Sequence, residues 1–204
     1  MICDAYITTV PENPSKHRQY CYELVKQAMI LSGMVPLTIR APLFHRFLAA
    51  EYNGKSEFYV LSDDDTIPMS PDAILNILDR IIKNEKLGII CLAPKKLTTK
   101  KELGDRWISE IEAGLHEITY PKGIMIIRRG LLPTNPHEWQ DQKINDKNKF
   151  NKTISDNEII ADMIRKKGYQ VAMDTNNWSY HLGDGYSTLL HDQFITYESL
   201  VQFN

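Results

Sequence analysis

Apolar residues occur in short runs that alternate with longer stretches of helical periodicity along most of the chain. Residues 5–10 form the first apolar run, and a proline-rich turn follows them. Ser15 then offers an N-cap for a helix that extends to about residue 31. The chain is therefore predicted to open with a strand, a turn and a helix.

The same alternation continues to residue 93. The predicted strands are residues 35–40, Phe58-Tyr59-Val60-Leu61 and residues 88–93, and the predicted helices are residues 42–52 and the segment from Ser70-Pro71 to residues 83–86. The second of these helices has the clearest pattern, with apolar residues at helical spacing at Ile74, Leu75, Ile77, Leu78, Ile81 and Ile82. An irregular or helical insert follows residue 93.

The second half is less regular. Residues 124–127 predict a strand, residues 133–153 a long polar surface loop, residues 156–167 a helix ended by Gly168, residues 169–173 a strand, and residues 178–181 a further apolar segment. Internal repeats are absent from the sequence. Strands alternating with helices favour an α/β fold, with a mainly parallel sheet and helices on both faces. A length of 204 residues suits one domain.

Composition narrows the function classes only slightly. The chain is 43% hydrophobic and 25% charged, as expected of a globular protein, and its net charge of -2 offers no general attraction to nucleic acid or an anionic membrane. Its three cysteines lack the spacing of a zinc site or a disulfide framework, so we expect a reducing, cytoplasmic setting. The sequence predicts neither a signal peptide nor membrane insertion.

The strongest chemical signal is the run of aspartates at residues 63–65. These carboxylates follow the buried strand at residues 58–61 directly, and ligands of open α/β sheets bind beyond the carboxyl ends of the strands. Three adjacent carboxylates repel one another, and Mg²⁺ or Mn²⁺ would compensate their charge. The alternative is a solvated acidic turn before the next helix.

Two segments resemble a known family. Residues 58–68 resemble the DxD segment of GT-A glycosyltransferases, particularly those of family 2, in which an apolar strand delivers carboxylates to nucleotide and metal. Ser155-Asp156-Asn157-Glu158, Gly168-Tyr169-Gln170-Val171 and His181-Leu182-Gly183 resemble the acidic helix start, glycine turn and terminal histidine of the same enzymes. The two resemblances cover most of the chain in order.

The resemblance implies a role for each carboxylate of the run. Asp63 and Asp64 would contact the ribose or the diphosphate, Asp65 would bind Mn²⁺ or Mg²⁺, and His181 would complete the metal's ligands. It also implies one GT-A-like domain over residues 1–204, with a nucleotide-binding half at about 1–95 and an acceptor-binding half at about 96–204.

An inverting transfer also needs a carboxylate that deprotonates the acceptor hydroxyl. Asp156 and Glu158 are the candidates, with Asp156 slightly preferred. Both are also ordinary residues for the first turn of a helix, where Ser155 and Glu158 would form a capping box.

Other site residues are predicted from position. Thr8, Thr9, Val10 and Pro11 occupy the place where GT-A enzymes hold the nucleotide base. Trp107 and Trp139 are weaker candidates for acceptor binding, because aromatic faces stack on sugars, although ordinary packing explains them equally well.

The sequence and the resemblance thus predict a metal-dependent, inverting glycosyltransferase that uses a nucleoside diphosphate sugar, with UDP as the expected nucleotide. The acceptor could be a glycan, a protein or a modified DNA base. The alternatives are an inactive nucleotide- or carbohydrate-binding module, a metal-dependent phosphatase and a nucleotidyltransferase. Residues 8–14 lack the glycines of a nucleotidyltransferase loop, and two predicted strands precede the aspartates, unlike in haloacid-dehalogenase-type phosphatases.

Overall fold

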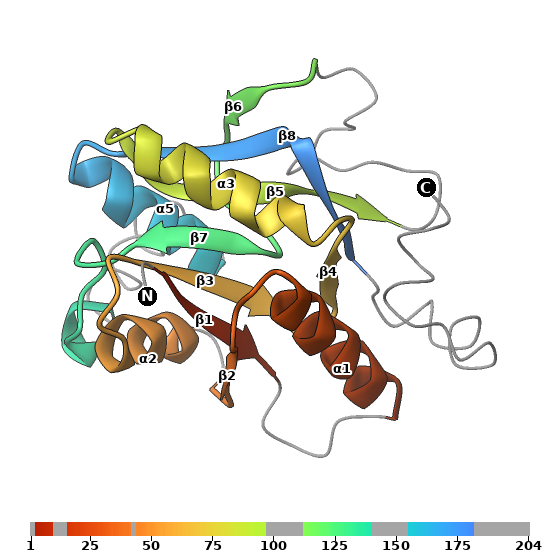
Figure 1. Cartoon of the computed structure of the whole chain (residues 1–204). Coiled ribbons are helices and arrows are strands. Elements are labelled where there is room, and N and C mark those ends of the chain that lie inside the picture. Colours follow the sequence, from red (N-terminus) through yellow and green to blue (C-terminus); the bar gives the residue numbers. More distant parts are fainter. Residues whose placement is uncertain (1–2, 10–15, 42–43, 97–111, 140–154, 182–204) are drawn as a thin grey trace.

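The computed structural model describes residues 3–9, 16–41, 44–96, 112–139 and 155–181. Its helices are α1 (Lys16–Leu31), α2 (His45–Asn53), α3 (Asp72–Lys83) and α5 (Asp156–Lys166). Its strands are β1 (Cys3–Thr8), β2 (Leu37–Ile39), β3 (Phe58–Asp63), β4 (Thr66–Pro68), β5 (Leu87–Lys96), β6 (Leu115–Glu117), β7 (Met125–Arg128) and β8 (Gln170–His181). Figure 1 shows the helices lying against a single twisted sheet.

The sheet has eight strands in the order β2-β1-β3-β7-β5-β8-β4, and β6 pairs with β8 beside this path. The α/β fold is confirmed, but the sheet is mixed rather than mainly parallel. Strand β7 runs antiparallel between β3 and β5, and β4 and β6 are antiparallel to β8. Parallel pairing joins β1 to β2 and β3, and β5 to β8.

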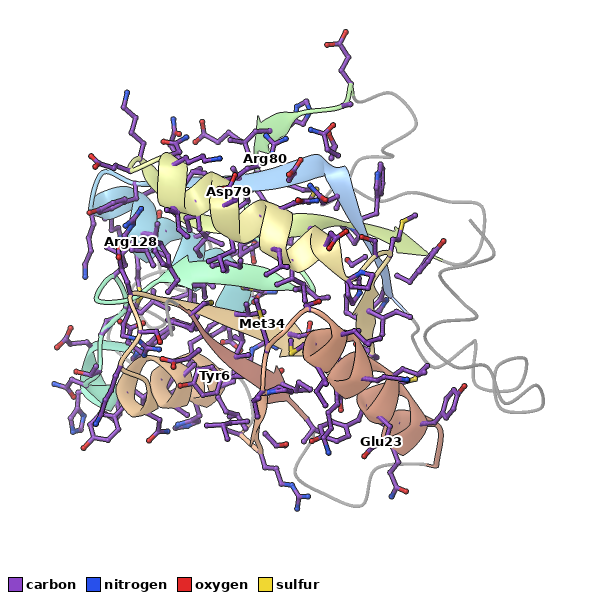
Figure 2. All side chains as sticks on the ribbon, viewed as in Figure 1. Tyr6, Glu23, Met34, Asp79, Arg80 and Arg128 are labelled. Atoms are coloured by element: carbon purple, nitrogen blue, oxygen red, sulfur yellow. The ribbon has the colours of Figure 1, made fainter. Side chains whose placement is uncertain are left out.

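Helices cover both faces of the sheet, as predicted. Alternate residues of each strand point to opposite faces, so the buried residues form two hydrophobic clusters. One cluster lies under α1 and α3 and includes Met34, whereas the other lies under α2 and α5 and includes Tyr6. Figure 2 marks both residues among the side chains. Within the described residues, the structure has no helix long and apolar enough to cross a membrane.

The strand β8 is longer than the sequence indicated. It continues from residue 170 to 181 as one element, and its pairing with β5 shifts register between Leu92 and Ala93. This irregularity accommodates the polar residues 175–177, which lie between the two segments predicted at residues 169–173 and 178–181. The end of β8 then pairs with β4, which places His181 opposite Thr66.

Candidate functional site

The three aspartates form a turn at the carboxyl end of β3. Asp63 is the last residue of that strand, and Asp64 and Asp65 connect it to β4. The side chain of Asp64 is fully buried, and that of Asp65 is nearly so. Ser62 Oγ donates to the carbonyl oxygens of both Asp63 and Thr66, which ties the two ends of the turn together. The turn is therefore built into the fold rather than being a solvated acidic loop.

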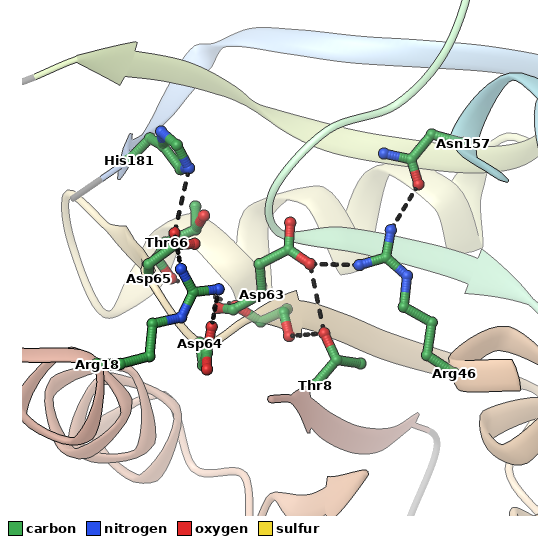
Figure 3. Close-up of polar contacts among 10 residues, drawn as sticks. Thr8, Arg18, Arg46, Asp63, Asp64, Asp65, Thr66, Asn157 and His181 are labelled. Carbon is green, nitrogen blue, oxygen red and sulfur yellow. Dashed lines mark hydrogen bonds and ion pairs between the residues drawn. The ribbon is translucent and has the colours of Figure 1, made fainter. Parts of the chain in front are cut away.

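Two arginines compensate the charge of this turn, and they approach it from opposite sides (Figure 3). Arg18 of α1 contacts Asp64 Oδ1 at 2.5 Å and Asp65 Oδ2 at 2.9 Å. Arg46 of α2 contacts Asp63 Oδ1 at 2.6 Å. Each carboxylate of the run thus has a guanidinium partner, so charge compensation by itself does not require a metal ion.

His181 meets the other side of the turn. Its Nε2 lies 3.4 Å from Asp65 Oδ2, the same oxygen that Arg18 contacts. The hydrogen bond with Asp65 raises the pKa of His181, while burial acts in the opposite direction. Burial alone would raise the pKa of Asp65, but His181 and Arg18 together outweigh it and hold that pKa below its usual value.

Asp63 has a different environment from Asp65. Desolvation raises its pKa, Arg46 opposes that effect, and the neighbouring carboxylates of Asp65 and Asp64 add to it. Thr8 Oγ1 lies 3.3 Å from Asp63 Oδ1, because β1 and β3 pair in parallel with Thr8 opposite Asp63. Asp63 is also the most exposed of the three carboxylates, with 29% of its side chain accessible.

A cavity of about 370 Å³ opens beside Asp63. Its volume lies within the range of small-molecule sites, roughly 300–1,000 Å³. Its polar lining includes the carboxylate of Asp63, the amide of Asn157, the imidazole of His181 and the amine of Lys122. Thr66, Pro94 and Gly123 complete the lining. The cavity therefore joins the acidic turn to the first turn of α5 and to the segment that precedes β7.

The first turn of α5 contributes Asn157 to the cavity rather than either predicted carboxylate. Asn157 Oδ1 accepts a hydrogen bond from Arg46 Nη2 at 2.9 Å. Glu158 completes a capping box, in which its Oε2 accepts from the backbone N–H of Ser155 while Ser155 Oγ accepts from that of Glu158. Asp156 belongs to the same turn and is partly buried. The capping prediction is confirmed, and the catalytic assignment of Asp156 and Glu158 remains a prediction.

Of the residues predicted to hold the nucleotide base, the structure brings Thr8 to the site. The backbone N–H of Thr9 donates to Ile39 O, which ties the end of β1 to β2. Val10, Pro11 and Trp107 lie outside the described residues.

The position of Trp139 argues against its predicted role in acceptor binding. Its side chain is only 1% exposed and stacks against Phe44 and Phe47. Its Nε1 donates to Pro133 O at 2.9 Å. Both its ring and its polar atom are used within the core under α2, so packing explains its place.

The acidic turn offers part of a metal site. Among the described residues, no group of three or more His, Cys, Asp or Glu side chains is gathered in a way that could hold a metal ion. His181 lines the cavity, and its Nε2 faces the carboxylate of Asp65, so the pair supplies one imidazole and one carboxylate beside the cavity. Mg²⁺ and Mn²⁺ sites often complete such a small set with phosphate oxygens and water. The residues present fit a metal that binds together with a diphosphate.

Sequence reasoning missed four residues that the structure brings to the site: Arg18, Arg46, Lys122 and Asn157. The two arginines lie on amphipathic helices, where a basic residue is ordinary. Asn157 lies between the two carboxylates that attracted attention, and Lys122 belongs to a segment without a clear pattern. No local signal distinguishes any of them.

No protein-family model matches the sequence, and no curated protein matches it. Solved structures do match. A glycosyltransferase involved in the glycosylation of the major capsid of PBCV-1 is 10% identical, with a TM-score of 0.53 over 98% of both chains. A197 from STIV is 15% identical, with a TM-score of 0.50 over 90% of this chain and 87% of that chain.

TarS from S. aureus is 9% identical, with a TM-score of 0.56 over 88% of this chain but 36% of TarS. A shorter form of TarS, covering its residues 1–349, matches in complex with UDP-GlcNAc, at 10% identity and a TM-score of 0.53 over 92% of this chain and 61% of that chain. These likenesses show the fold: the chain has an α/β fold of the GT-A glycosyltransferase type.

Proposed function

We propose that the chain is a glycosyltransferase that transfers a sugar from a nucleoside diphosphate sugar to an acceptor hydroxyl. The observation that carries this proposal is the position of the cavity. It opens at the carboxyl end of β3 beside Asp63, within a fold of the GT-A type. In open α/β sheets that edge is where nucleotides and other ligands bind.

The donor nucleotide is assigned to the acidic turn, with UDP as the expected nucleotide. TarS, which shares the fold, has been solved with UDP and with UDP-GlcNAc. Asp63 is the partly exposed carboxylate of the turn and is oriented by Thr8 and Arg46, so it suits a hydroxyl donor such as a ribose. Asp64 is fully buried and does not line the cavity, so in place of the direct nucleotide contact expected of it we assign it the role of holding Arg18.

Mn²⁺ or Mg²⁺ is assigned to Asp65 and His181. When bound there together with the donor, the cation would neutralise charge that develops on the departing diphosphate. Asp65 Oδ2 and His181 Nε2 face each other, and His181 lines the cavity, so one carboxylate oxygen and one ring nitrogen are available to the same ligand.

The catalytic base that deprotonates the acceptor is assigned to the first turn of α5, and the capping geometry favours Asp156. The Glu158 carboxylate already accepts the backbone N–H of Ser155, which ties it to the helix end. A carboxylate near a helix N-terminus remains ionised because the positive end of the helix dipole stabilises it. As this base takes the acceptor's proton, the acceptor oxygen attacks the anomeric carbon on the face opposite the diphosphate, the bond to the diphosphate breaks, and the configuration is inverted.

The acceptor is a glycan, a protein or a modified DNA base. The PBCV-1 enzyme is involved in glycosylation of a capsid, which places protein and glycan acceptors first in a screen. Lys122 is the lysine among the residues that line the cavity, and its ammonium group can pair with an anionic group of the donor or acceptor.

Calorimetric titration of UDP, GDP, CDP and dTDP, with and without Mn²⁺, tests the donor assignment before any acceptor is known. We expect one diphosphate to bind, and its affinity to depend on Mn²⁺. If none of the four diphosphates binds under either condition, the assignment of the donor site is wrong. That result would favour the phosphatase and acidic-turn interpretations. Binding without catalysis would instead favour a nucleotide- or carbohydrate-binding module.

A further inference from the structure

Arg18 links two neighbouring carboxylates at the centre of the site. One guanidinium nitrogen, Nη2, contacts Asp64 Oδ1 at 2.5 Å, and the other, Nη1, contacts Asp65 Oδ2 at 2.9 Å. A guanidinium is planar and presents its nitrogens as a fork, so one side chain can hold two acceptors at once. Arg18 therefore fixes the relative orientation of the two carboxylates (Figure 3).

The same contact conflicts with metal binding. The oxygen of Asp65 that Arg18 contacts is also the one that faces His181 Nε2. A divalent cation held by Asp65 and His181 would occupy the space between them and would repel the guanidinium. Arg18 Nη1 and the metal are thus alternative partners of Asp65 Oδ2.

We propose that Arg18 is a positioning residue that exchanges partners when the donor binds. This proposal rests on the proposed function. Without the donor, Arg18 neutralises Asp64 and Asp65, and it disfavours binding of the metal in the absence of the diphosphate. When metal and diphosphate arrive together, Nη1 leaves Asp65 and donates to a phosphate oxygen, while Nη2 stays on Asp64. The two ligands therefore bind cooperatively, because the diphosphate offers Arg18 a replacement for the carboxylate it gives up.

The burial of the three side chains fits this exchange. Asp64 is fully buried, so its charge needs a constant partner, and loss of that partner would be strongly unfavourable. The Arg18 side chain is 25% exposed and that of Asp65 is 8% exposed, and Asp65 Oδ2 faces His181, which lines the cavity. The contact with Asp65 is thus the one that a ligand in the cavity can replace.

The test measures Mn²⁺ binding by electron paramagnetic resonance, with and without UDP, for the natural protein and for Arg18→Gln. In the natural protein we expect weak Mn²⁺ binding alone and a gain of about tenfold or more with UDP, within the usual range of coupling between sites. Arg18→Gln should bind Mn²⁺ alone about tenfold more tightly and should lose most of the gain, since the competing cation is gone.

Two further variants separate the outcomes. Arg18→Lys keeps a positive charge beside Asp64, but a lysine cannot span both carboxylates. It should therefore show the same tighter Mn²⁺ binding and the same loss of the gain with UDP, and it serves as the test if Arg18→Gln folds poorly. Arg80→Gln removes a comparable ion pair, between an arginine that is 38% exposed and the fully buried Asp174, outside the cavity lining, and should bind Mn²⁺ as the natural protein does.

Failure of the proposal is distinguishable from failure of the proposed function. If the natural protein binds UDP with Mn²⁺ but both Arg18 variants bind Mn²⁺ alone no more tightly, the exchange is wrong and the donor site stands. If the natural protein binds no nucleoside diphosphate at all, the donor site and the exchange are both wrong.

Discussion

His181 Nε2 lies 3.4 Å from Asp65 Oδ2, although Asp65 lies in the turn between β3 and β4 and His181 is the last residue of β8. The pairing of β4 with β8 explains their meeting, because it sets Thr66, the neighbour of Asp65, opposite His181. The last residue of a long strand is thereby brought to the acidic turn.

Replacement of Asp156 should separate catalysis from donor binding. If Asp156 is the base, Asp156→Asn should lower kcat by roughly 10²- to 10⁴-fold, the usual contribution of general base catalysis, with little change in UDP affinity. Glu158→Gln is the matched control, since glutamine can still accept the Ser155 N–H of the capping box. Initial rates with a competent acceptor and calorimetry with UDP provide the two readouts. A large loss in Glu158→Gln alone would assign the base to Glu158.

Gly123 should be sensitive to the smallest substitution. Its φ is +65°, and a Cβ there would lie 2.9 Å from Thr66 Cγ2, in the residue that follows the acidic turn. Gly33→Ala is the control, because Gly33 has φ +75° but nothing within 4 Å of the added carbon.

Urea denaturation of the two glycine variants measures the difference. Gly33→Ala should lose about 1–2 kcal/mol from left-handed backbone strain alone. Gly123→Ala should lose a further 1–3 kcal/mol or so from overpacking, and it should weaken UDP binding because Thr66 must move. Equal losses in both variants, with UDP affinity intact, would show that Gly123 does not support the turn.

Trp139→Ala should affect stability rather than acceptor recognition. The ring is buried between Phe44 and Phe47, so its removal should lower the free energy of unfolding by about 3–5 kcal/mol. Trp139→Phe retains an aromatic ring and loses the hydrogen bond to Pro133, so it should lose less. Chemical denaturation gives the stability, and acceptor KM tests recognition. An unchanged stability with a raised KM would restore the original acceptor assignment.

Asp4 should contribute pH-dependent stability at the opposite end of β1 from Thr8. Its carboxylate accepts from the backbone N–H groups of Lys55 and Ser56 and from Arg129. Burial opposes ionisation, but these donors, together with Ser56 Oγ, outweigh it and lower the pKa of Asp4.

Because the folded-state pKa is depressed, this stability is present above the unfolded pKa of about 3.9 and is lost as pH falls through the lower folded value. At pH 7, Asp4→Asn should lose roughly 1–3 kcal/mol, and the gap from the natural protein should narrow below about pH 4. Thermal melts of both proteins from pH 2 to 7 measure this difference in stability. Asp79→Asn, which removes an exposed pair with Lys83, should change little. A gap that stays constant down to pH 2 would contradict the assignment.

Much of the fold could be predicted from local sequence. The apolar run that ends at Leu61, the start of α3 just after Ser70 and Pro71, and the capping box of Ser155 and Glu158 all have short-range causes. The antiparallel placement of β7 could not be predicted in this way, because strand order depends on long-range packing of two faces that are equally apolar. Strands β4 and β6 are short, and their pairing with β8 defines them.

The candidate site was only partly predictable for the same reason. A run of three aspartates after a buried strand is visible in the sequence, and His181 followed from a resemblance. The two arginines that neutralise these aspartates lie on two earlier helices, whose sequence gives no indication of their partners. The expected charge repulsion was physically sound, but the helices supply its compensation.

Release of the nucleoside diphosphate from its nucleotide sugar tests the central claim most directly. The assay uses Mn²⁺, the natural protein and Asp65→Ala, with the sugar nucleotide chosen from the diphosphate that binds. We expect release by the natural protein and a loss of roughly 100-fold or more in Asp65→Ala, because metal stabilisation of the leaving group contributes several kcal/mol. Unchanged, metal-dependent release by Asp65→Ala, or no release by the natural protein with any acceptor, would contradict the glycosyltransferase assignment.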